Sequence, residues 1–567
     1  MSLINALNVG KSALVVHQAA LQVTGNNIAN AGNADYTRQT TSIGPTADHQ
    51  VKPGLFVGTG VTLNNIRRQI DEALQNRLRG SVSDADGADA EQQWLSRVEA
   101  MFNELSDDDV STRLSTFFNS WSNLANEPQD VGRRQIVLQG GEAAAASFRT
   151  LRDQLVGLQK DLDARQAAAV KDADGLAQRV ADLNSQISQA EGGTGGIANG
   201  LRDQRDAALK ELAQIVDVKV VDTGDGMVNV TLGSEPLVIG SNNRGLKLKT
   251  GTTPDGQLTA KVVFKADGGT ARITSGQLGA MAAVRGKIDT VVAQTDELAG
   301  NLIFELNKVH AAGQGLKGFT DVVAGTAVAD ATKALNSAEA KLPFAPTNGS
   351  FVVHVKQKGS GLETGTLVKV NLDGLNADDT TLATLAADLD AIDGVTATVT
   401  GGRLRLKSDS PDIELSFSQD SSGTLAALGV NAFFTGKDAR DITVNDAVKA
   451  DPGLLAAAKN GNSGDNQTAR AIAALETTGL ARLDGGTLKE AYQSMVNGVA
   501  LDARTAKTNA QATQTIRDTL AAQREALSGV SLDEEAINLV KQQRAFQGAA
   551  RFLAAVDEMM KTVLQLV

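Results

Sequence analysis

The sequence of 567 residues contains no cysteine, which excludes disulfides, thiolate metal sites and cysteine nucleophiles. Aromatic residues make up only 3% of the chain, a composition that favours long helices over aromatic-lined ligand pockets. No apolar run reaches the length of a membrane span, and the longest early run, Ala13 to Val16, is too short for a cleavable signal peptide. We therefore expect a soluble chain of two to four domains without a Sec-type signal.

Charge is the next constraint. The net charge is −12 and the pI is about 5.0, which argues against binding to nucleic acid. The N-terminal end differs from the rest, because residues 1–70 contain more basic than acidic side chains: Lys11, Arg38, Lys52, Arg67 and Arg68 against Asp35 and Asp48. This end of the chain is therefore distinct from the acidic whole.

Both termini carry an apolar stripe with alternating spacings of three and four residues, which is typical of a helix with one adhesive seam. The N-terminal stripe consists of Leu3, Leu7, Gly10, Leu14, His17, Leu21, Thr24 and Ile28. The C-terminal stripe consists of Leu532, Ala536, Leu539, Gln543, Phe546, Ala550, Leu553, Asp557, Met560, Leu564 and Val567. Because an isolated helix of this length is marginal in water, the seams must pair with each other, with other copies, or both.

The segment VTGNNIANAGNADYTRQ, residues 23–39, places a dense patch of amides directly after the N-terminal seam. Gly25, Asn26 and Asn27 suit left-handed cap geometry, so we expect them to stop the first helix. Asparagine amides both donate and accept hydrogen bonds, so Asn26, Asn27 and Asn30 could also join neighbouring chains.

The regions between the termini alternate in periodicity. Helical spacing predicts helices over residues 92–126, 142–190, 200–216, 276–312 and 465–525. A period of two predicts hairpins over residues 219–240 and 247–264, with Gly-Asp-Gly and Pro-Asp-Gly turns. Residues 313–437 read as short alternating strands, namely FVVHVKQ, LVKVNLD, TATVT, RLRLK and IELSFS, interrupted by a helix near residues 382–392.

The predicted fold is mainly α with β. The terminal helices, residues 1–66 with 526–567, pair as a coiled coil. Residues 67–312 with 438–525 form an elongated helical rod domain with β-hairpins, and residues 313–437 form an inserted β-rich outer domain.

Chemistry-bearing motifs are scarce. The chain has only His17, His49, His310 and His354, and no two of them have the spacing of helix-face metal ligands. His17 reads as a packed seam residue, and His354 is expected to face solvent on a strand. The acidic runs 84–86 and 107–109 lack the bidentate glutamate of a calcium loop and read as turns and helix starts. We expect neither an enzyme nor a cofactor or metal site.

The residues do resemble a known family. The segment SLINALNVGKSALVVHQAALQVTGNNIANAGNADYTRQ is similar to the N-terminal signature of bacterial flagellar rod, hook and hook-associated proteins, and NNIANA, residues 26–31, is the specific part. The segments 117–138, 201–220, 274–289, 431–445 and 528–567 resemble the hook-associated members at the hook–filament junction. The resemblance is weakest over residues 313–400.

This resemblance implies a structural, self-assembling component at the junction between hook and filament, exported by the flagellar type III apparatus without signal cleavage. It implies an extracellular location on the flagellum and a transient cytoplasmic stage. The implied partners are other copies of the chain, the hook protein, hook-associated protein 3, the type III export apparatus and an export chaperone, without nucleic acid or membrane insertion.

The expected assembly interface comprises Leu3, Leu7, Leu14, Leu21, Asn26, Asn27, Ile28, Asn30, Leu532, Leu539, Phe546, Leu553, Met560 and Leu564. The expected chaperone-binding positions are Leu539, Phe546, Leu553 and Met560. Two alternatives stay open: a hook or distal rod protein of the same family, and an adhesin-like protein that binds a ligand through residues 313–437.

Overall fold

The computed structural model describes residues 3–102, 109–193, 196–252, 258–375, 378–462 and 464–565. Helices predominate and short antiparallel strands lie between them, so the fold is mainly α with β, as predicted. The chain divides into two compact units, one formed by Met1–Trp94, Asp161–Val284 and Arg504–Val567, the other by Leu95–Lys160 and Arg285–Ala503. The three-domain division remains a prediction.

Four long helices have residues in both units: α2 (Glu72–Phe102), α4 (Val131–Glu191), α6 (Gly276–Ala311) and α11 (Leu488–Ser528). The helix predicted over residues 142–190 is thus longer than expected, with 61 residues in α4. The helix predicted over 465–525 is instead two helices, since α10 (Gln467–Ala474) and α11 are separate. Asp484 between them has a left-handed backbone with a φ of 52°, which interrupts the helical hydrogen bonds.

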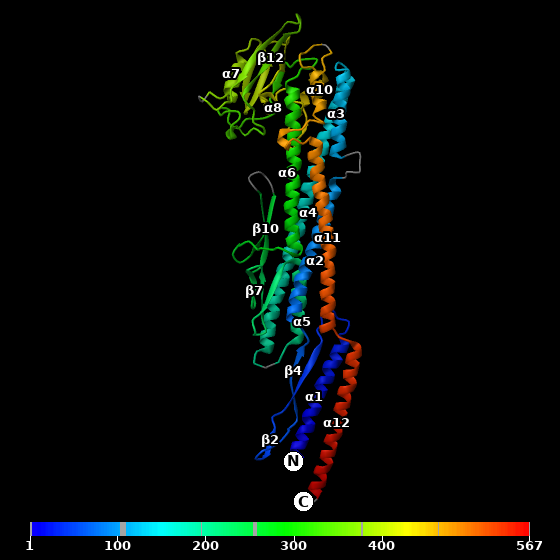
Figure 1. Ribbon diagram of the computed structural model, residues 1–567. Helices are drawn as coiled ribbons and strands as arrows, with labels where there is room; N and C mark the ends of the chain where they lie inside the picture. The colour runs from blue at the N-terminus through cyan, green and yellow to red at the C-terminus, as the bar shows by residue number, and fades with distance from the viewer. Residues whose placement is uncertain are drawn as a thin grey trace. The chain divides into compact units, whose positions relative to one another are not determined.

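In the first unit, α1 (Leu3–Ala29) and α12 (Leu532–Gln565) pack side by side along their lengths (Figure 1). They run antiparallel, because Gly10 lies against Leu553 whereas Asn27 contacts Glu535. A Cβ added at Gly10 would lie only 3.1 Å from Leu553 Cδ1, so the absence of a side chain lets the helices approach closely. Val567 of the predicted seam lies outside the described residues.

The region after α1 contains strands that the sequence analysis missed. Strand β1 (Gln39–Pro45) pairs with β4 (Val61–Arg68), and β2 (His49–Lys52) pairs with β3 (Leu55–Val57), all antiparallel. The assignment of residues 1–66 to a helical region is therefore wrong for this stretch. Strands β1, β2 and β4 are mostly polar, so they give only a weak period-two signal.

The predicted hairpins of the first unit are confirmed. Helix α5 (Asn199–Ile215) leads into a sheet with the order β5 (Val218–Asp222), β6 (Val228–Leu232), β7 (Glu235–Ile239) and β8 (Asn242–Asn243). Gly224 and Gly226 have a φ of 84° each in the predicted Gly-Asp-Gly turn. Strands β9 (Leu246–Thr252) and β10 (Leu258–Phe264) pair as predicted, but their Pro-Asp-Gly turn lies outside the described residues.

Helix α2 begins twenty residues earlier than predicted. Its start is capped by Asp71, whose Oδ1 accepts a hydrogen bond from Leu74 N at 3.0 Å. The acidic run 84–86 lies inside this helix, so its interpretation as a turn or helix start is wrong. Burial of Leu74, Val82 and Ala85 keeps this Gly- and Ser-rich stretch helical against its weak propensity. Of the other acidic run, Asp109 does cap α3 (Val110–Asn126), while residues 107–108 lie outside the described residues.

The second unit has an aromatic core where α3 and α6 meet the segment 431–434. Phe117, Trp121, Phe433 and Phe434 are fully buried, and their ring centroids lie between 4.7 and 6.4 Å apart. His310 packs among them with Nδ1 2.8 Å from Asn431 O, and Ala456 N donates to its Nε2 at 3.0 Å. Burial lowers the pKa of His310 to about 4, so this histidine is a neutral core residue.

The strands predicted over residues 313–437 are confirmed. Strands β13 (Glu363–Val370), β12 (Gly349–Gln357) and β16 (Ile413–Ser418) form one sheet, and β11 (Asp321–Val323), β15 (Arg403–Ser408) and β14 (Val395–Thr400) form another. Helix α7 (Leu382–Asp390) packs on β14, and α8 (Thr424–Leu428), β17 (Phe434–Thr435), β18 (Thr443–Val444) and α9 (Asp446–Ala450) follow.

The expectation that His354 faces solvent is wrong. Its Nδ1 lies 2.7 Å from a carboxylate oxygen of Glu363, and its Nε2 lies 2.7 Å from Ser418 Oγ. Alternation along a strand places a side chain on one face of the sheet, but the polar neighbours on adjacent strands decide whether that face is exposed.

Candidate functional site

Asn27 is the centre of a joint between the two ends of the chain. It lies in the last turns of α1 with only 1% of its surface exposed. Its Nδ2 donates to Gln39 O at 2.9 Å and to Glu535 at 3.1 Å, and its Oδ1 accepts from Tyr36 Oη at 2.8 Å and Gln39 N at 3.0 Å. Both amide donors and both acceptor positions are therefore used.

Glu535, in the first turns of α12, is the carboxylate that this joint encloses. It is 2% exposed, and Arg38 donates to its Oε1 from Nε at 2.9 Å. Arg38 also contacts Glu534 at 2.6 Å, and its backbone N donates to Ser528 O at 2.9 Å. Burial lowers the pKa of Arg38, but the hydrogen bonds to Glu534 and Glu535 outweigh this effect, and its pKa lies above its ordinary value.

Tyr36 connects the same joint to α5. Burial and the nearby carboxylates of Asp203 and Glu535 raise the pKa of Tyr36 to about 12. Asp203 accepts from Arg68 at 2.9 Å and from Thr37. Burial raises the pKa of Asp203 in spite of these donors. The joint therefore combines α1, the segment after it, α5 and α12 within the first unit.

The amide patch does not stop the first helix as predicted. α1 continues through Gly25 to Ala29, because Val23, Thr24 and Asn27 are buried and hold this turn in place. Asn30 follows the end of the helix and donates from Nδ2 to Asn26 O at 2.9 Å, while the Asn26 side chain is exposed. The amides thus differ in role: Asn27 fixes the joint, Asn30 caps the helix, and Asn26 faces outward.

The predicted C-terminal seam is half correct. Leu539, Phe546, Leu553 and Met560 are half-buried, and Leu553 lies against Gly10 of α1. Ala536, Gln543 and Ala550, which also belong to the predicted seam, are exposed. Glu535, Gln542 and Ala549, each one position earlier, are buried or half-buried in their place, and so is Val556. Gln542 Oε1 lies 2.8 Å from His17 Nδ1, so His17 is a packed seam residue, as predicted. The predicted stripe and the stripe that is covered in the structure both contain Leu539, Phe546 and Leu553 at a spacing of seven residues. The sequence alone could therefore not distinguish between them.

The other predicted interface residues have mixed exposure. Leu3, Leu7, Leu14, Leu21 and Ile28 are half-buried, whereas Leu532 and Leu564 are 57% and 76% exposed. Arg38, Tyr36, Gln39 and Glu535 were missed as site residues, although the first three lie in the amide-rich segment. Glu535 follows Asp533 and Glu534 in sequence, so nothing local distinguishes it from a solvated acidic turn.

Helix α12 also carries apolar side chains away from α1. Ile537, Val540, Met559 and Val563 are between 46% and 69% exposed. We call these four residues the outer stripe. Ile537 and Val540 lie near the start of α12 and Met559 and Val563 near its end, so the apolar surface of the outer stripe consists of two separate pairs.

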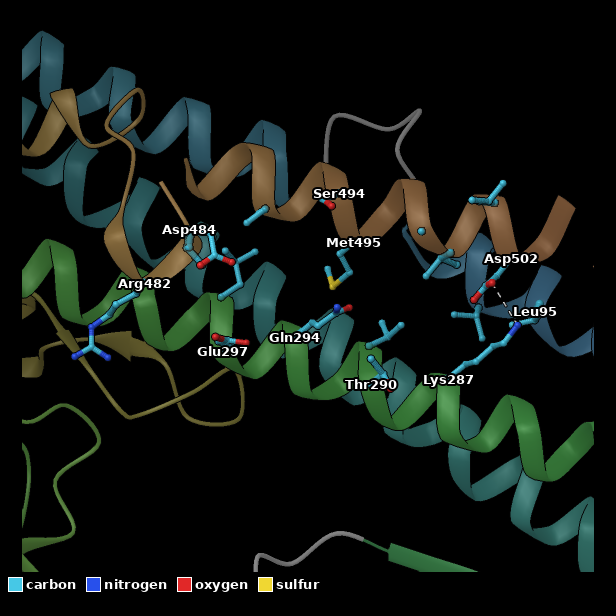
Figure 2. Close-up of a pocket in the computed structure, with 18 residues that line it drawn as sticks. Leu95, Lys287, Thr290, Gln294, Glu297, Arg482, Asp484, Ser494, Met495 and Asp502 are labelled. Atoms are coloured by element: carbon cyan, nitrogen blue, oxygen red, sulfur yellow. Dashed lines mark ion pairs between the residues drawn. The ribbon is translucent and has the colours of Figure 1, made fainter. Parts of the chain in front are cut away.

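The second unit contains a groove of about 600 Å³ between α6 and α11 (Figure 2). Three of its charged groups already have partners within the chain: Lys287 Nζ lies 3.3 Å from Asp502, and the guanidinium of Arg482 lies 5.0 Å from the ring centre of Phe304. No group of three or more acidic or histidine side chains among the described residues could hold a metal ion. In the same residues, no helix is long and apolar enough to cross a membrane.

Comparisons with known proteins agree with this architecture. A family model described as the helical domain of flagellar hook-associated protein FlgK matches residues 95–323, and one described as the C-terminal part of flagellar basal body rod FlgEFG proteins matches residues 521–566. Flagellar hook-associated protein 1 of Escherichia coli K12 is 28% identical, with 99% of both chains covered. The Bacillus subtilis protein of that name is 26% identical, with 98% of this chain and 97% of its own covered.

The structure of the flagellar hook junction protein FlgK from Burkholderia pseudomallei has the same fold. Its TM-score is 0.50 at 16% identity, covering 80% of this chain and all of that one. The fold and the full-length matches define a structural protein of the bacterial flagellum. More particularly, the chain belongs to the family of flagellar hook-associated protein 1, the structural component of the hook–filament junction.

Proposed function

We propose that many copies of this chain assemble at the tip of the hook and form the junction on which the filament is built. The observation that carries the proposal is that α12 has apolar side chains on two faces while α1 covers only one of them. The outer stripe then buries itself against neighbouring copies, and the antiparallel α1–α12 pair acts as a coiled coil at the centre of the assembly.

The proposed interface includes the residues inferred from the sequence. The exposed Leu532 and Leu564 on α12 and Asn26 on α1 are available to a neighbour without any rearrangement. The half-buried seam residues, such as Leu7 and Leu539, contribute by holding the two helices together. The hook protein on one side and hook-associated protein 3 on the other are the proposed neighbours outside the ring of copies.

We further propose that the chain leaves the cell through the flagellar type III apparatus after a cytoplasmic stage in which a chaperone covers its C-terminal seam. In support, Leu539, Phe546, Leu553 and Met560 are half-buried in the folded structure, and Leu553 lies against Gly10 of α1. A chaperone and α1 would therefore compete for the same side chains, which keeps the terminal pair open until export is complete.

A deletion strain tests the proposal. Cells without this chain should build hooks but release flagellin into the medium, and a plasmid copy of the gene should restore attached filaments. Electron microscopy of the hooks and immunoblots of the medium measure both outcomes. Normal filaments on the deletion strain would contradict the proposed junction role.

A further inference from the structure

The β2–β3 hairpin of the first unit has little cover. All four residues of β2 are exposed, and so are Leu55 and Phe56 of β3. Its turn is Pro53-Gly54, where Gly54 has a φ of 81°. Because a two-stranded hairpin that packs on no other element is marginally stable in water, this one needs a surface that covers it.

The tip of the hairpin combines apolar side chains with a free cation. Val51, Leu55 and Phe56, which flank the turn, are 47%, 53% and 59% exposed. Lys52 is exposed beside them and makes no ion pair within the residues that the structure describes. We call these four residues the hairpin tip. A cluster of this kind suits a contact with another chain that offers apolar area and a carboxylate.

Helix α12 carries a surface with both of these properties. Three apolar side chains, spaced seven and four residues apart, lie on one face of the helix near its end and are between 45% and 50% exposed. We call them the distal ridge: Phe552, Met559 and Val563. Glu558 is exposed beside the ridge and makes no ion pair in the described part of the chain, because the nearby Lys561 pairs with Asp557 at 2.8 Å.

Helix α1 fixes where both surfaces lie in one copy. Gly60, at the base of the hairpin, lies against Val9 and Ser12, and Val61 N donates to Ser12 Oγ at 3.4 Å. Gly10 lies against Phe552, with only 3.2 Å between an added Cβ and Phe552 Cδ1. Each residue turns a helix by about 100°, so Val9 and Ser12 lie on a different face of α1 from Gly10.

The two surfaces therefore leave α1 at the same level but on different sides. Both are exposed, so neither covers the other within one copy. Two different surfaces at one level on a single molecule are what a heterologous contact requires, and such a contact repeats from copy to copy around an axis.

We propose that the hairpin tip of one copy packs on the distal ridge of the next copy, with Lys52 beside Glu558. The proposal rests on the junction role above and identifies one of its contacts. Charge complementarity supports a second copy as the partner, since the free cation of the tip matches the free carboxylate of the ridge. The contact also continues the interface proposed above, because Met559 and Val563 belong to the outer stripe.

Cross-linking tests this contact directly, because the chain has no cysteine of its own. The full-length chain with Phe56→Cys and Met559→Cys is expressed in the deletion strain, and isolated hooks with filaments are treated with a short bis-maleimide. A denaturing gel should show dimers, trimers and higher multiples, since each copy gives one end and receives the other. Either substitution alone should leave monomers. Val221→Cys with Met559→Cys is the matched control, since Val221 on β5 is 58% exposed, and should give no ladder.

A charge exchange provides a second test that needs no cross-linker. Lys52→Glu and Glu558→Lys should each lower the number of filament-bearing cells about fivefold, and the two together should restore it. The melting temperature of each purified monomer should stay within about 2 °C of the wild type, because neither residue has an ion pair to lose in one copy. Lys219→Glu, at an exposed position of β5, is the control and should leave filaments unchanged.

Several outcomes would overturn the proposal. Filaments that give no ladder with the cysteine pair would show that the contact does not exist, and dimers from Phe56→Cys alone would show a twofold contact between hairpins. Cross-links to the hook protein or to hook-associated protein 3, identified by mass spectrometry, would show that a different protein covers the tip.

The charge exchange decides the matter if the cysteine pair blocks filament growth. Single charge variants that the double variant does not rescue would then overturn the pairing of tip and ridge. If the wild-type gene itself fails to restore filaments, the junction role fails instead, so the two failures can be told apart.

Discussion

At the scale of single residues, the joint shows how one buried amide can connect distant parts of a chain. Asn27 has a partner for each of its donors and acceptors, and these partners come from the segment after α1 and from α12. Within the part of the chain that the structure describes, the exposed side chain of Asn26 makes no comparable contact. The amide patch thus combines the buried Asn27, Asn30 as the cap of the helix, and exposed amides such as Asn26.

We predict that Asn27→Ala destabilises the terminal pair by about 2–3 kcal/mol, because it leaves the buried Glu535 and the Tyr36 hydroxyl short of a partner. Amide exchange of α1 and α12 in the purified monomer measures the loss. Asn26→Ala is the control and should change protection by less than about 0.5 kcal/mol. Equal effects of the two substitutions would contradict the assignment of Asn27 as the centre of the joint.

A second prediction concerns Tyr36, whose pKa of about 12 exceeds its ordinary value of 10.0. Between these values the folded chain keeps the phenolic proton while the unfolded chain has lost it. The stability that Tyr36 contributes is therefore complete below pH 10 and is lost as the pH rises toward 12. Ultraviolet titration of Tyr492→Phe, which leaves Tyr36 as the remaining tyrosine, should show this midpoint. A midpoint near 10 would mean that the phenol is freely solvated.

At the scale of elements, α12 has two apolar surfaces with different roles. The seam faces α1, and the outer stripe has no cover within the described residues. An interface between copies that used only the seam would have to displace α1 first.

We predict that Phe546→Asp and Ile537→Asp separate these roles. Phe546 faces α1, so a charge there should open the terminal pair of the monomer, make amide exchange fast in α1 and α12, and block assembly, while the rest of the chain stays folded. Ile537 is 69% exposed on the outer stripe, so its charged variant should leave exchange of the monomer unchanged and still reduce incorporation at the hook tip. Fast exchange in both helices of the wild-type monomer would show that even the native pair forms only on assembly.

At the scale of the whole molecule, the segment that carries the strands of residues 313–437 begins and ends at adjacent points within the second unit. Asn431 Nδ2 donates to Gly313 O at 3.0 Å, just beyond the end of α6. Phe433 and Phe434 belong to the aromatic core with Trp121 and not to the cluster formed by the strands. A deletion of the strands that leaves the aromatic core intact must therefore end before residue 431.

We predict that replacing residues 319–429 by a short Gly-Ser linker leaves hook attachment and filament growth intact, because the aromatic core and the joint are retained. Counting filaments in the complemented deletion strain measures this. Removing all of 313–437 also deletes Phe433 and Phe434, which are buried, and should lower the expression of folded protein. Complete loss of filaments with the smaller deletion would show that the strands are needed for assembly.

Much of the fold follows from local pattern. The helical spacing of the termini, the Gly-Asp-Gly hairpin turn and the alternating strands of residues 349–418 agree with the structure, because periodicities of 3.6 and 2 arise from backbone geometry alone. The flagellar family was likewise visible in the amide-rich segment and the C-terminal stripe. None of these conclusions needs knowledge of which segments meet in space.

The tertiary structure alone decided the rest. It kept α1 helical through Gly25 and α2 through Gly80, since burial of neighbouring side chains outweighs a propensity cost of about 1 kcal/mol per glycine. Packing against α1 determined which of the two overlapping stripes of α12 is covered. It also brought Glu535 next to Asn27, although more than five hundred residues separate them in the sequence. Partners this distant in sequence leave no periodic trace, because their contact depends on the packing of whole helices.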